Sequence, residues 1–160
     1  METIDETSAG GIVYKQLTTN SKQPVTLWLI TQHSQHKGWV FPKGLIADKE
    51  SKESKEDAAI REVQEEGGIK ARIVNPTPIV VKYTYQWYGS PHAKGAKQKY
   101  LVDKTVFYYL MKYESGDPKD HDWEMMDAKF ATEEEVKKLL SYPSDKEAFK
   151  KACTLFKSLQ

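Results

Sequence analysis

Apolar residues alternate with polar ones along much of the chain, which is the pattern of half-buried strands. Six segments are rich in β-branched and aromatic residues and are expected to form strands: residues 10–14, 25–31, 39–41, 79–87, 101–113 and 125–130. A polar turn at residues 17–24 would join the first two strands, and Pro42 and Gly44 bring the third to an end.

Polar residues at capping positions predict three helices in the same chain. Each begins with Ser or Thr followed three residues later by an acidic residue: Ser54 with Asp57, Thr132 with Glu135, and Ser144 with Glu147. The first helix ends at Gly67-Gly68, and its Ile60 and Val63 are expected to face a core, away from its glutamates. Strands on both sides of one central helix, with two helices at the end, predict an α/β sandwich.

The size and charge of the chain limit the classes of protein to consider. At 160 residues it is long enough for a proper core, and residues 1–160 are predicted to form a single domain. The formal net charge of +1 gives no reason to expect specific nucleic acid binding. No apolar run approaches the length of a membrane span and the first residues are acidic, so a soluble protein of the cytoplasm is expected.

The chain has one cysteine, Cys153, which excludes an internal disulfide and fits a reducing compartment. Cys153 shares an apolar helix face with Phe149 and Phe156. We therefore expect a buried thiol that packs as a small hydrophobic group rather than a nucleophile.

The predicted central helix carries three glutamates on one face. Glu62, Glu65 and Glu66 stand at positions i, i+3 and i+4, which fall within roughly a 100° arc of a helix. Like charges this close repel one another, so the arrangement indicates a partner of opposite charge. Hard divalent cations such as Mg²⁺ and Mn²⁺ bind oxygen ligands and often reach phosphate-bearing substrates through a few carboxylates. The alternative is a solvated acidic face balanced by nearby Lys and Arg.

The residues around these glutamates favour the metal site. From Glu53 onward the sequence resembles the Nudix box, G-x5-E-x7-R-E-U-x-E-E-x-G-U, in which U is a bulky aliphatic residue. The rest of the box is filled in order by Arg61, Glu62, Val63, Glu65, Glu66, Gly68 and Ile69. The departure is at the front, where eight residues instead of five separate Gly44 from Glu53. Glu50 would restore that spacing but not the spacing to Arg61, so we take Glu53 and predict an enlarged surface loop at residues 45–52.

The resemblance to the Nudix family implies a fold and a set of roles. It implies an α/β/α sandwich with a central mixed sheet, in which the box forms a loop, a helix and a second loop. It also implies ligands for Mg²⁺, or for Mn²⁺ in its place, from one carbonyl and three carboxylates: Gly44, Glu62, Glu65 and Glu66. Arg61 is expected to orient Glu62, and Glu53 to tie the loop to the helix. One of these carboxylates, or a glutamate on a later loop, would act as general base.

Glu124 is the best candidate for that later glutamate. It lies six residues before Phe130, where related enzymes often carry a glutamate ahead of an aromatic strand residue. There it would be a catalytic residue and a metal ligand. The alternative is an exposed acid in a loop rich in Asp and Lys.

Segments outside the box resemble the diadenosine polyphosphate hydrolases. The entry into the box reads W-x-F-P-K-G, and residues 104–110 resemble a strand of the type K-T-V-aromatic. By this resemblance Lys43 would approach the phosphates of a substrate as a point charge and Tyr85 would stack on adenine. Three lysines between the two long strands would contact a long phosphate chain: Lys94, Lys97 and Lys99. The alternatives are an aromatic core position for Tyr85 and solvated loops for the lysines.

The sequence thus predicts a Mg²⁺-dependent Nudix pyrophosphohydrolase acting on a nucleoside diphosphate linked to another moiety. Dinucleoside polyphosphates such as diadenosine tetraphosphate are the leading substrate class. Other substrates for the same metal site are nucleoside triphosphates or oxidised nucleotides, RNA 5′ ends, ADP-ribose and inositol pyrophosphates, because specificity lies in the surrounding pockets. The alternative from another class is a Nudix module that senses nucleotides without hydrolysis, but the intact box from Arg61 to Ile69 counts against it.

Overall fold

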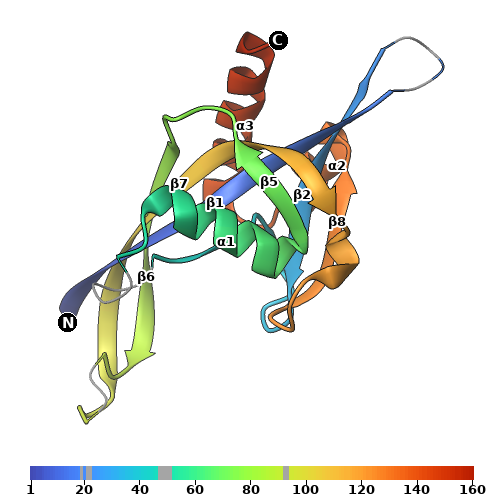
Figure 1. The fold of residues 1–160 in the computed structure, drawn as a ribbon. Coiled ribbons are helices and arrows are strands. Elements are labelled where there is room, and N and C mark those ends of the chain that lie inside the picture. Colours follow the sequence, from blue (N-terminus) through green and yellow to red (C-terminus); the bar gives the residue numbers. More distant parts are fainter. Residues whose placement is uncertain (19, 21–22, 47–51, 92–93) are drawn as a thin grey trace.

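The computed structural model describes residues 1–18, 20, 23–46, 52–91 and 94–160 (Figure 1). Most of the predicted loop at residues 45–52, including Glu50, lies outside the described residues, as does part of the predicted turn at residues 17–24. None of the helices in the described ranges is both long enough and apolar enough to cross a membrane. In chain order the elements are β1 (Glu2–Leu17), β2 (Val25–His33), β3 (Trp39–Val40), β4 (Lys43–Leu45), α1 (Lys55–Gly67), β5 (Ile69–Ile73), β6 (Ile79–Gly89), β7 (Gln98–Gly116), the 3₁₀ helix η1 (Pro118–Asp120), β8 (Met125–Ala131), α2 (Glu133–Leu139) and α3 (Pro143–Ser158).

Strands β1 and β7 form the centre of the sheet. They run parallel and in register, from Glu2 opposite Tyr100 to Tyr14 opposite Lys112. Their other neighbours are antiparallel: β2 and β4 pair with β1, and β5 and β6 pair with β7. Strands β3 and β8 pair in turn with β2. The sheet is therefore mixed, as predicted.

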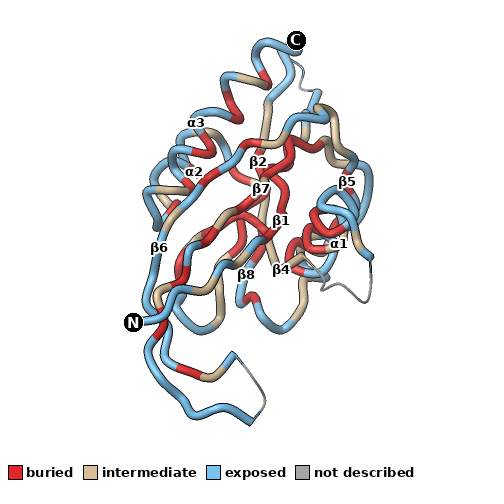
Figure 2. The backbone as a smooth tube through the Cα atoms, turned by 90° about the vertical axis from the view of Figure 1, so that its left-hand side faces the viewer, coloured by how far each residue is buried: buried red, intermediate tan, exposed pale blue. Residues whose placement is uncertain are grey.

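The helices divide between the two faces of this sheet because successive residues of a strand point to opposite faces. On one face Val13 belongs to the same buried cluster as Leu29 and Val63 of α1. On the other face the next position along β1, Ile12, belongs to a cluster with Phe149 of α3. Figure 2 shows α1 and α3 on opposite sides of the sheet. The predicted α/β/α sandwich is confirmed.

Helix α1 is rotated relative to the sequence prediction. Val63 is buried as expected, but Ile60 is 37% exposed and the buried face includes Glu62 and Glu66. At about 100° per residue, Glu66 falls near the middle of the buried arc and Ile60 lies at its edge. The prediction for Ile60 was wrong because two small alanines, rather than the larger aliphatic residue, form the contact with the sheet. Glu62 and Glu66 are therefore directed into the molecule and not away from the core, whereas Glu65 is exposed.

The capping predictions held for two of the three helices. Ser54 Oγ accepts a hydrogen bond from the Asp57 N–H at 3.1 Å, and Thr132 Oγ1 accepts one from the Glu135 N–H at 3.2 Å.

Helix α3 begins earlier than predicted and has no side-chain cap. Tyr142 is its N-cap and Pro143 its first residue, so Ser144 lies inside the first turn. Proline has a φ angle close to the helical value and no N–H to satisfy, so the helix starts without a capping hydroxyl. The prediction of Ser144 as the cap was wrong for this reason.

The strand predictions missed pairings between distant parts of the chain. Strand β1 starts at Glu2 rather than Gly10, because its first half pairs with β7. Strand β4 follows Pro42, where the sequence indicated only a stop, and pairs with β1 through Gly44 opposite Ala9. Strand β5 directly follows α1 and pairs with the end of β7.

Cys153 is buried in α3, as expected from its apolar neighbours. Burial, with a smaller effect of the nearby Glu133 carboxylate, raises the pKa of the Cys153 thiol to about 12. The thiol is therefore protonated in the folded protein across the physiological pH range.

This raised pKa predicts a slow reaction of the native protein with iodoacetamide. At a pH of about 8 an unfolded cysteine is partly thiolate, whereas Cys153 in the fold is almost entirely thiol, so native labelling should be at least about a hundredfold slower. Mass spectrometry with and without guanidinium chloride measures the two rates, with Cys153→Ser as the unlabelled control. Equal rates in the two conditions would contradict the burial of this side chain.

Candidate active site

Helix α1 is fixed at the end where its glutamates lie. Gly68 follows the helix with a φ of 73°, a left-handed conformation that favours glycine, and its N–H donates to the Gln64 carbonyl at 3.0 Å. A Cβ at Gly68 would lie 2.7 Å from the Asp117 carbonyl oxygen. The Asp122 N–H donates to the Glu65 carbonyl at 2.8 Å. The last turn of α1 is thus joined to the loop that carries Glu124.

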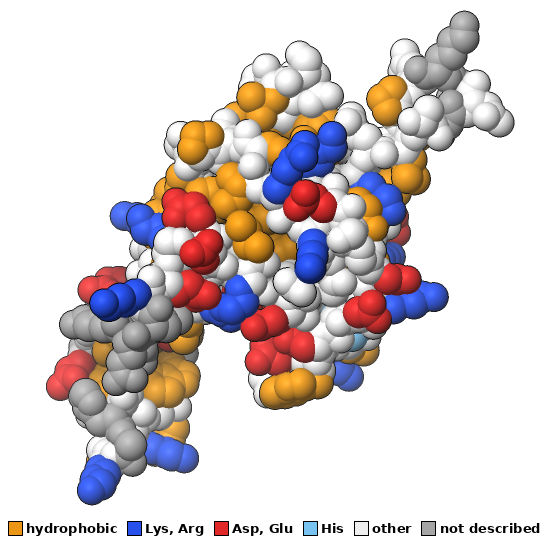
Figure 3. All heavy atoms as spheres, in the orientation of Figure 1, with side chains coloured by type: hydrophobic (Ala, Val, Ile, Leu, Met, Phe, Trp, Pro, Cys, Tyr) orange, Lys and Arg blue, Asp and Glu red, His pale blue; other side chains and the backbone are white. Residues whose placement is uncertain are grey.

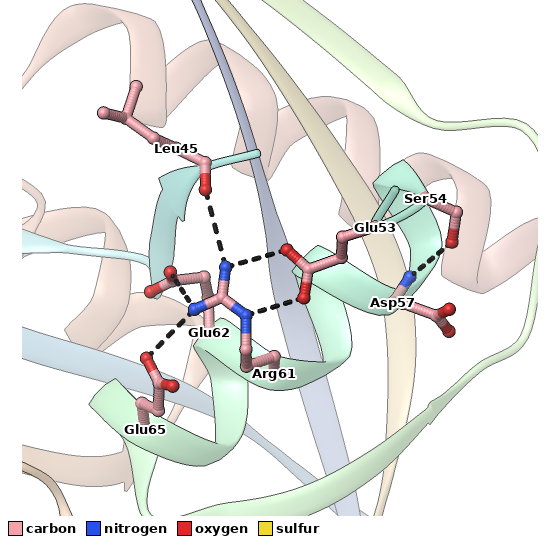
Figure 4. Close-up of polar contacts among 7 residues, drawn as sticks. All are labelled: Leu45, Glu53, Ser54, Asp57, Arg61, Glu62 and Glu65. Atoms are coloured by element: carbon pink, nitrogen blue, oxygen red, sulfur yellow. Dashed lines mark hydrogen bonds and ion pairs between the residues drawn. The ribbon is translucent and has the colours of Figure 1, made fainter. Parts of the chain in front are cut away.

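Arg61 is the centre of an ion-pair network on α1 (Figure 4). Its Nε and Nη2 bind both carboxylate oxygens of Glu53, at 2.7 and 3.0 Å. Its Nη1 donates to Glu62 Oε1 at 2.8 Å and to Glu65 Oε2 at 3.2 Å. The Leu45 carbonyl accepts a long hydrogen bond from Nη2 at 3.5 Å. One guanidinium therefore holds three carboxylates, one from before the helix and two from within it.

These contacts raise the pKa of Arg61, first through the hydrogen bond to Glu53 and then through the charges of Glu62 and Glu53. The bidentate pair with Glu53 uses the planar fork of the guanidinium, which a lysine could not reproduce. Arg61 thus lies where the resemblance placed it, against Glu62, and Glu53 links the segment before α1 to the helix.

Gly44 lies directly against the Glu62 carboxylate. A Cβ built on Gly44 would overlap the carboxylate carbon and both oxygens of Glu62. One residue earlier, the Lys43 N–H donates to Glu66 Oε1 at 3.0 Å. Strand β4 and helix α1 are therefore brought together by contacts between backbone and carboxylate, and only glycine fits at position 44 without moving Glu62.

The two inward glutamates resist ionisation. Burial raises the pKa of Glu66 to about 8, and the charges of Glu62 and Glu124 add to that effect, while the Lys43 N–H opposes it. Burial also raises the pKa of Glu62, with Arg61 opposing and Glu65 and Glu124 reinforcing the shift. Carboxyl groups in this situation gain from a nearby cation, because it offsets both the desolvation and the mutual repulsion.

Glu124 reaches the same region from the loop before β8. Its carbonyl accepts hydrogen bonds from the N–H and the Oγ of Ser34, at 3.0 and 2.8 Å, and its own N–H donates to Asp122 Oδ1 at 3.1 Å. The backbone around Glu124 is thus held on both sides, and the residue is exposed. Glu124 lines a cavity of about 280 Å³ together with Gly44 and Glu66.

The donor set fits a divalent cation. It consists of carboxylate and carbonyl oxygens, which Mg²⁺ and Mn²⁺ prefer. Within the described ranges no three acidic, histidine or cysteine side chains are already gathered as a complete set of ligands. Arg61 binds one oxygen each of Glu62 and Glu65, so an ion would be coordinated by the second oxygen of each carboxylate. Glu65 is half-exposed. Its role as a metal ligand remains a prediction, as do the roles of Gly44, Glu62, Glu66 and Glu124.

The predicted substrate residues divide into two groups. Lys43 lines the cavity that Glu66 and Glu124 share. Tyr85 lies on β6, is 37% exposed, and donates its hydroxyl to Glu6 Oε1 at 2.8 Å.

The three lysines of the second group are exposed in and beside the loop that joins β6 to β7: Lys94, Lys97 and Lys99. This hairpin projects to the lower left of Figure 1, and basic side chains lie at its end in Figure 3. The three lysines are not among the residues that line the cavity with the box glutamates. Their predicted contact with substrate would need a ligand long enough to reach the hairpin.

The cavity also contains residues that the sequence prediction did not single out. Ser8, His33, His36 and Lys104 line it beside Lys43. The sequence carried a signal for Lys104, because it stands two and four residues before Val106 and Tyr108 and so shares their face of the strand. Lysine is unusual at such an inward position. Ser8 carries no such signal, because serine is common at both buried and exposed strand positions.

Comparison with known proteins agrees with this architecture. The family model of the NUDIX domain matches residues 14–152. The putative mutator protein MutT4 of Mycobacterium tuberculosis is 29% identical over 163 residues, which is 100% of this chain but 59% of that relative. The chain therefore spans less than two thirds of the length of this curated relative.

Two solved structures share the fold. The C. elegans Ap4A hydrolase, solved as a binary complex, matches with a TM-score of 0.70 at 24% identity, over 96% of this chain and 98% of that one. A NUDIX-family hydrolase from Clostridium perfringens matches with a TM-score of 0.62 at 17% identity, over 97% of this chain and 98% of that one.

The contact between Gly44 and Glu62 predicts that a substitution at Gly44 weakens metal binding without lowering the stability of the fold. In Gly44→Ala the new methyl group displaces the flexible end of the Glu62 side chain, so the fold should keep its melting temperature to within about 4 °C. Displacement of one candidate ligand should weaken Mg²⁺ or Mn²⁺ binding roughly 10- to 100-fold. Isothermal titration calorimetry and thermal melting measure the two effects.

Gly95→Ala, in the exposed loop between β6 and β7, is the matched control and should leave the affinity for the metal unchanged. Wild-type metal affinity in Gly44→Ala would show that the position of the Glu62 carboxylate does not matter for metal binding.

Proposed function

The chain belongs to the NUDIX domain family, and we propose that within it this protein is a divalent-metal-dependent pyrophosphohydrolase. Its substrate would be a nucleoside diphosphate linked to another moiety, with dinucleoside polyphosphates such as diadenosine tetraphosphate as the leading class. The similarity in fold to an Ap4A hydrolase and the W-x-F-P-K-G entry into the box support this substrate class. We propose residues 1–160 as one Nudix hydrolase domain that acts in the cytoplasm, where its single thiol would stay reduced.

One observation carries the proposal of an enzyme: two glutamates of α1 are buried against the entry to the box. Glu62 and Glu66 are 8% and 6% exposed and contact Gly44 and the Lys43 N–H respectively. A purely structural role for this pair is unfavourable, because burial opposes the charge of both groups. A catalytic cation bound at this site would explain why both carboxylates are buried there.

The proposed mechanism assigns each group a task. Mg²⁺, or Mn²⁺, would be held by Glu62, Glu65 and Glu66 with the Gly44 carbonyl and Glu124, and when bound it would neutralise phosphate charge and activate a water molecule. Arg61 keeps Glu62 in place through their ion pair.

The substrate and its proton would be handled by groups around the same cavity. The Lys43 ammonium would bind a phosphate as a point charge. A box glutamate or Glu124 would accept the proton from the attacking water as general base.

The acidic residues of the box predict a large loss of turnover without loss of fold. Glu65→Gln and Glu66→Gln keep the shape of the side chain but remove a charged ligand, so kcat should fall by roughly three orders of magnitude or more. Hydrolysis of diadenosine tetraphosphate, followed by ion-exchange chromatography, measures kcat, and circular dichroism checks the fold. Glu147→Gln, an exposed position on α3, is the matched control. Near wild-type rates in both box variants at saturating Mg²⁺ would remove the catalytic assignment.

The substrate class is tested with a panel of phosphate chains of increasing length. If Lys43 binds the chain, kcat/KM should be higher for diadenosine tetraphosphate than for ADP-ribose or a nucleoside triphosphate. Lys43→Ala should lower kcat/KM more for the longer substrate. Lys146→Ala removes an exposed charge on α3 and serves as the control. Tyr85→Ala should weaken binding of all adenine-bearing substrates by about 1–3 kcal/mol if its ring stacks on the base.

Two outcomes of the same panel would contradict parts of the proposal. A kcat/KM at least tenfold higher for ADP-ribose or an oxidised nucleoside triphosphate would contradict the proposed substrate class. It would leave the assignment as a pyrophosphohydrolase unchanged. Tight nucleotide binding without hydrolysis, with Mg²⁺ and Mn²⁺ both tried, would indicate a nucleotide sensor instead.

A further inference from the structure

Helix α3 carries a buried carboxylate that the proposed mechanism does not use. Asp145 lies in the first turn of α3 and is 4% exposed. Its Oδ1 accepts a hydrogen bond from the Tyr108 hydroxyl of β7 at 2.8 Å, and Tyr108 is itself fully buried. A buried carboxylate is costly unless hydrogen bonds and an opposite charge stabilise it. The hydroxyl supplies a hydrogen bond but no charge, so a cation is expected close to Asp145.

The register of three strands places Lys43 beside this pair. Gly10 of β1 lies opposite Lys43 of β4 on one side and opposite Tyr108 of β7 on the other. Residues that lie opposite each other in a sheet point to the same face, which for Tyr108 is the face covered by α3. Gly10 has no side chain between them, and a Cβ there would lie 2.7 Å from Lys43 Cβ. The glycine therefore leaves room for the Lys43 side chain to extend toward Asp145.

Three pKa shifts agree with this position of the Lys43 ammonium. Burial raises the pKa of Asp145, and the Lys43 charge is the largest influence that lowers it, ahead of the Tyr108 hydroxyl. Burial also raises the pKa of Tyr83 on β6, and Lys43 is again the largest opposing influence. On the side of α1, burial raises the pKa of Glu66 and the Lys43 charge opposes it. The ammonium thus lies between a carboxylate of α3 and one of α1.

The segment before α3 fixes Asp145 in space. The Trp39 N–H donates to Ser141 Oγ at 2.9 Å, and the Ser141 N–H donates to the Trp39 carbonyl at 3.2 Å. Helix α3 begins two residues later, at Pro143. A helix N-terminus favours an acidic side chain, but an exposed one would serve that purpose. The burial of Asp145 against Tyr108 is therefore not explained by the helix alone.

We propose that Asp145 is a positioning residue for substrate binding, whose carboxylate holds the Lys43 ammonium at the edge of the cavity. The role of Lys43 toward the substrate rests on the proposed function, whereas its pairing with Asp145 does not. Lys43 lines the cavity and Asp145 does not, so Asp145 would act through Lys43 and not touch the substrate. Loss of its charge should therefore weaken substrate binding and leave the chemical step unchanged.

Asp145→Asn tests this role, because it keeps the shape of the side chain and an acceptor for Tyr108 but removes the charge. KM for diadenosine tetraphosphate should rise about tenfold, the effect of losing one hydrogen bond between charged groups, while kcat stays within about twofold. Steady-state hydrolysis with ion-exchange chromatography gives both values. Glu147→Gln, an exposed acid on the same helix, is the matched control and should leave KM unchanged. A wild-type KM in Asp145→Asn would overturn the proposal.

A double-mutant cycle with Lys43→Ala separates positioning from a general effect on the fold. Without Lys43 there is no ammonium to hold, so Asp145→Asn should cause no further rise in KM. An equal rise in both backgrounds would show that Asp145 acts on the fold and not through Lys43, and would overturn the proposal.

The melting temperature of the same variants decides the matter if Asp145→Asn alone is too unstable to assay. In Lys43→Ala the Asp145 charge is buried and has lost its partner, so adding Asp145→Asn should raise the melting temperature. A lower or unchanged melting temperature would contradict the pairing.

Labelling with an amine-reactive ester measures the pairing without any hydrolysis. Asp145→Asn should raise severalfold the labelling rate of Lys43 relative to that of the exposed Lys119, because the released side chain regains its conformational freedom. Mass spectrometry of the two sites gives the ratio, and an unchanged ratio would contradict the pairing. A raised ratio in a protein that hydrolyses no substrate would contradict the proposed function and leave the pairing of Asp145 with Lys43 in place.

Discussion

The bidentate pair between Arg61 and Glu53 is the interaction on which the candidate site depends. Without it, three carboxylates on and before α1 would repel one another in a partly buried environment. The positive charge of the Arg61 guanidinium offsets this repulsion. Its geometry is fixed, because two of its nitrogens bind Glu53 and the third, Nη1, binds Glu62 and Glu65. It also joins the segment before the helix to the helix itself. The charge balance and the shape of the site thus come from one side chain.

The residues of the candidate site make the fold locally less stable than an apolar core would. Glu66 is close to the middle of the buried face of α1, where an apolar residue would pack better, and Ser8 carries an unpaired hydroxyl in the adjoining cavity. Both residues break a rule of core packing, and both line one cavity. Proteins commonly keep such exceptions where they bind ligands. The apolar clusters on the two faces of the sheet stabilise the fold around them.

The sequence was sufficient for the features that depend on local chemistry or on the box itself. Helix α1, its caps at Ser54 and Gly68, and the mixed α/β/α sandwich are as predicted. The sequence was not sufficient for features that depend on contacts between segments far apart in the chain. The rotation of α1 follows from how closely its alanines approach the sheet, and strand β5 follows from pairing with β7. The cavity residues Ser8 and Lys104 come from strands β1 and β7, which meet only in the folded chain.

The parallel pairing of β1 with β7 also determines the order in which this chain can fold. Glu2 lies opposite Tyr100 and Tyr14 opposite Lys112, so the centre of the sheet closes only after most of the chain has been synthesised. The second half of β1 has an early partner, because Leu17 lies opposite Val25 in a local hairpin with β2. In the first half, Ser8 and Ala9 pair with β4, whereas residues 2–6 pair with β7 and must wait until that strand is available. Such non-local pairing slows folding and leaves strand edges exposed in the meantime. On the ribosome residues 2–6 would therefore be among the last parts of the sheet to find their neighbours.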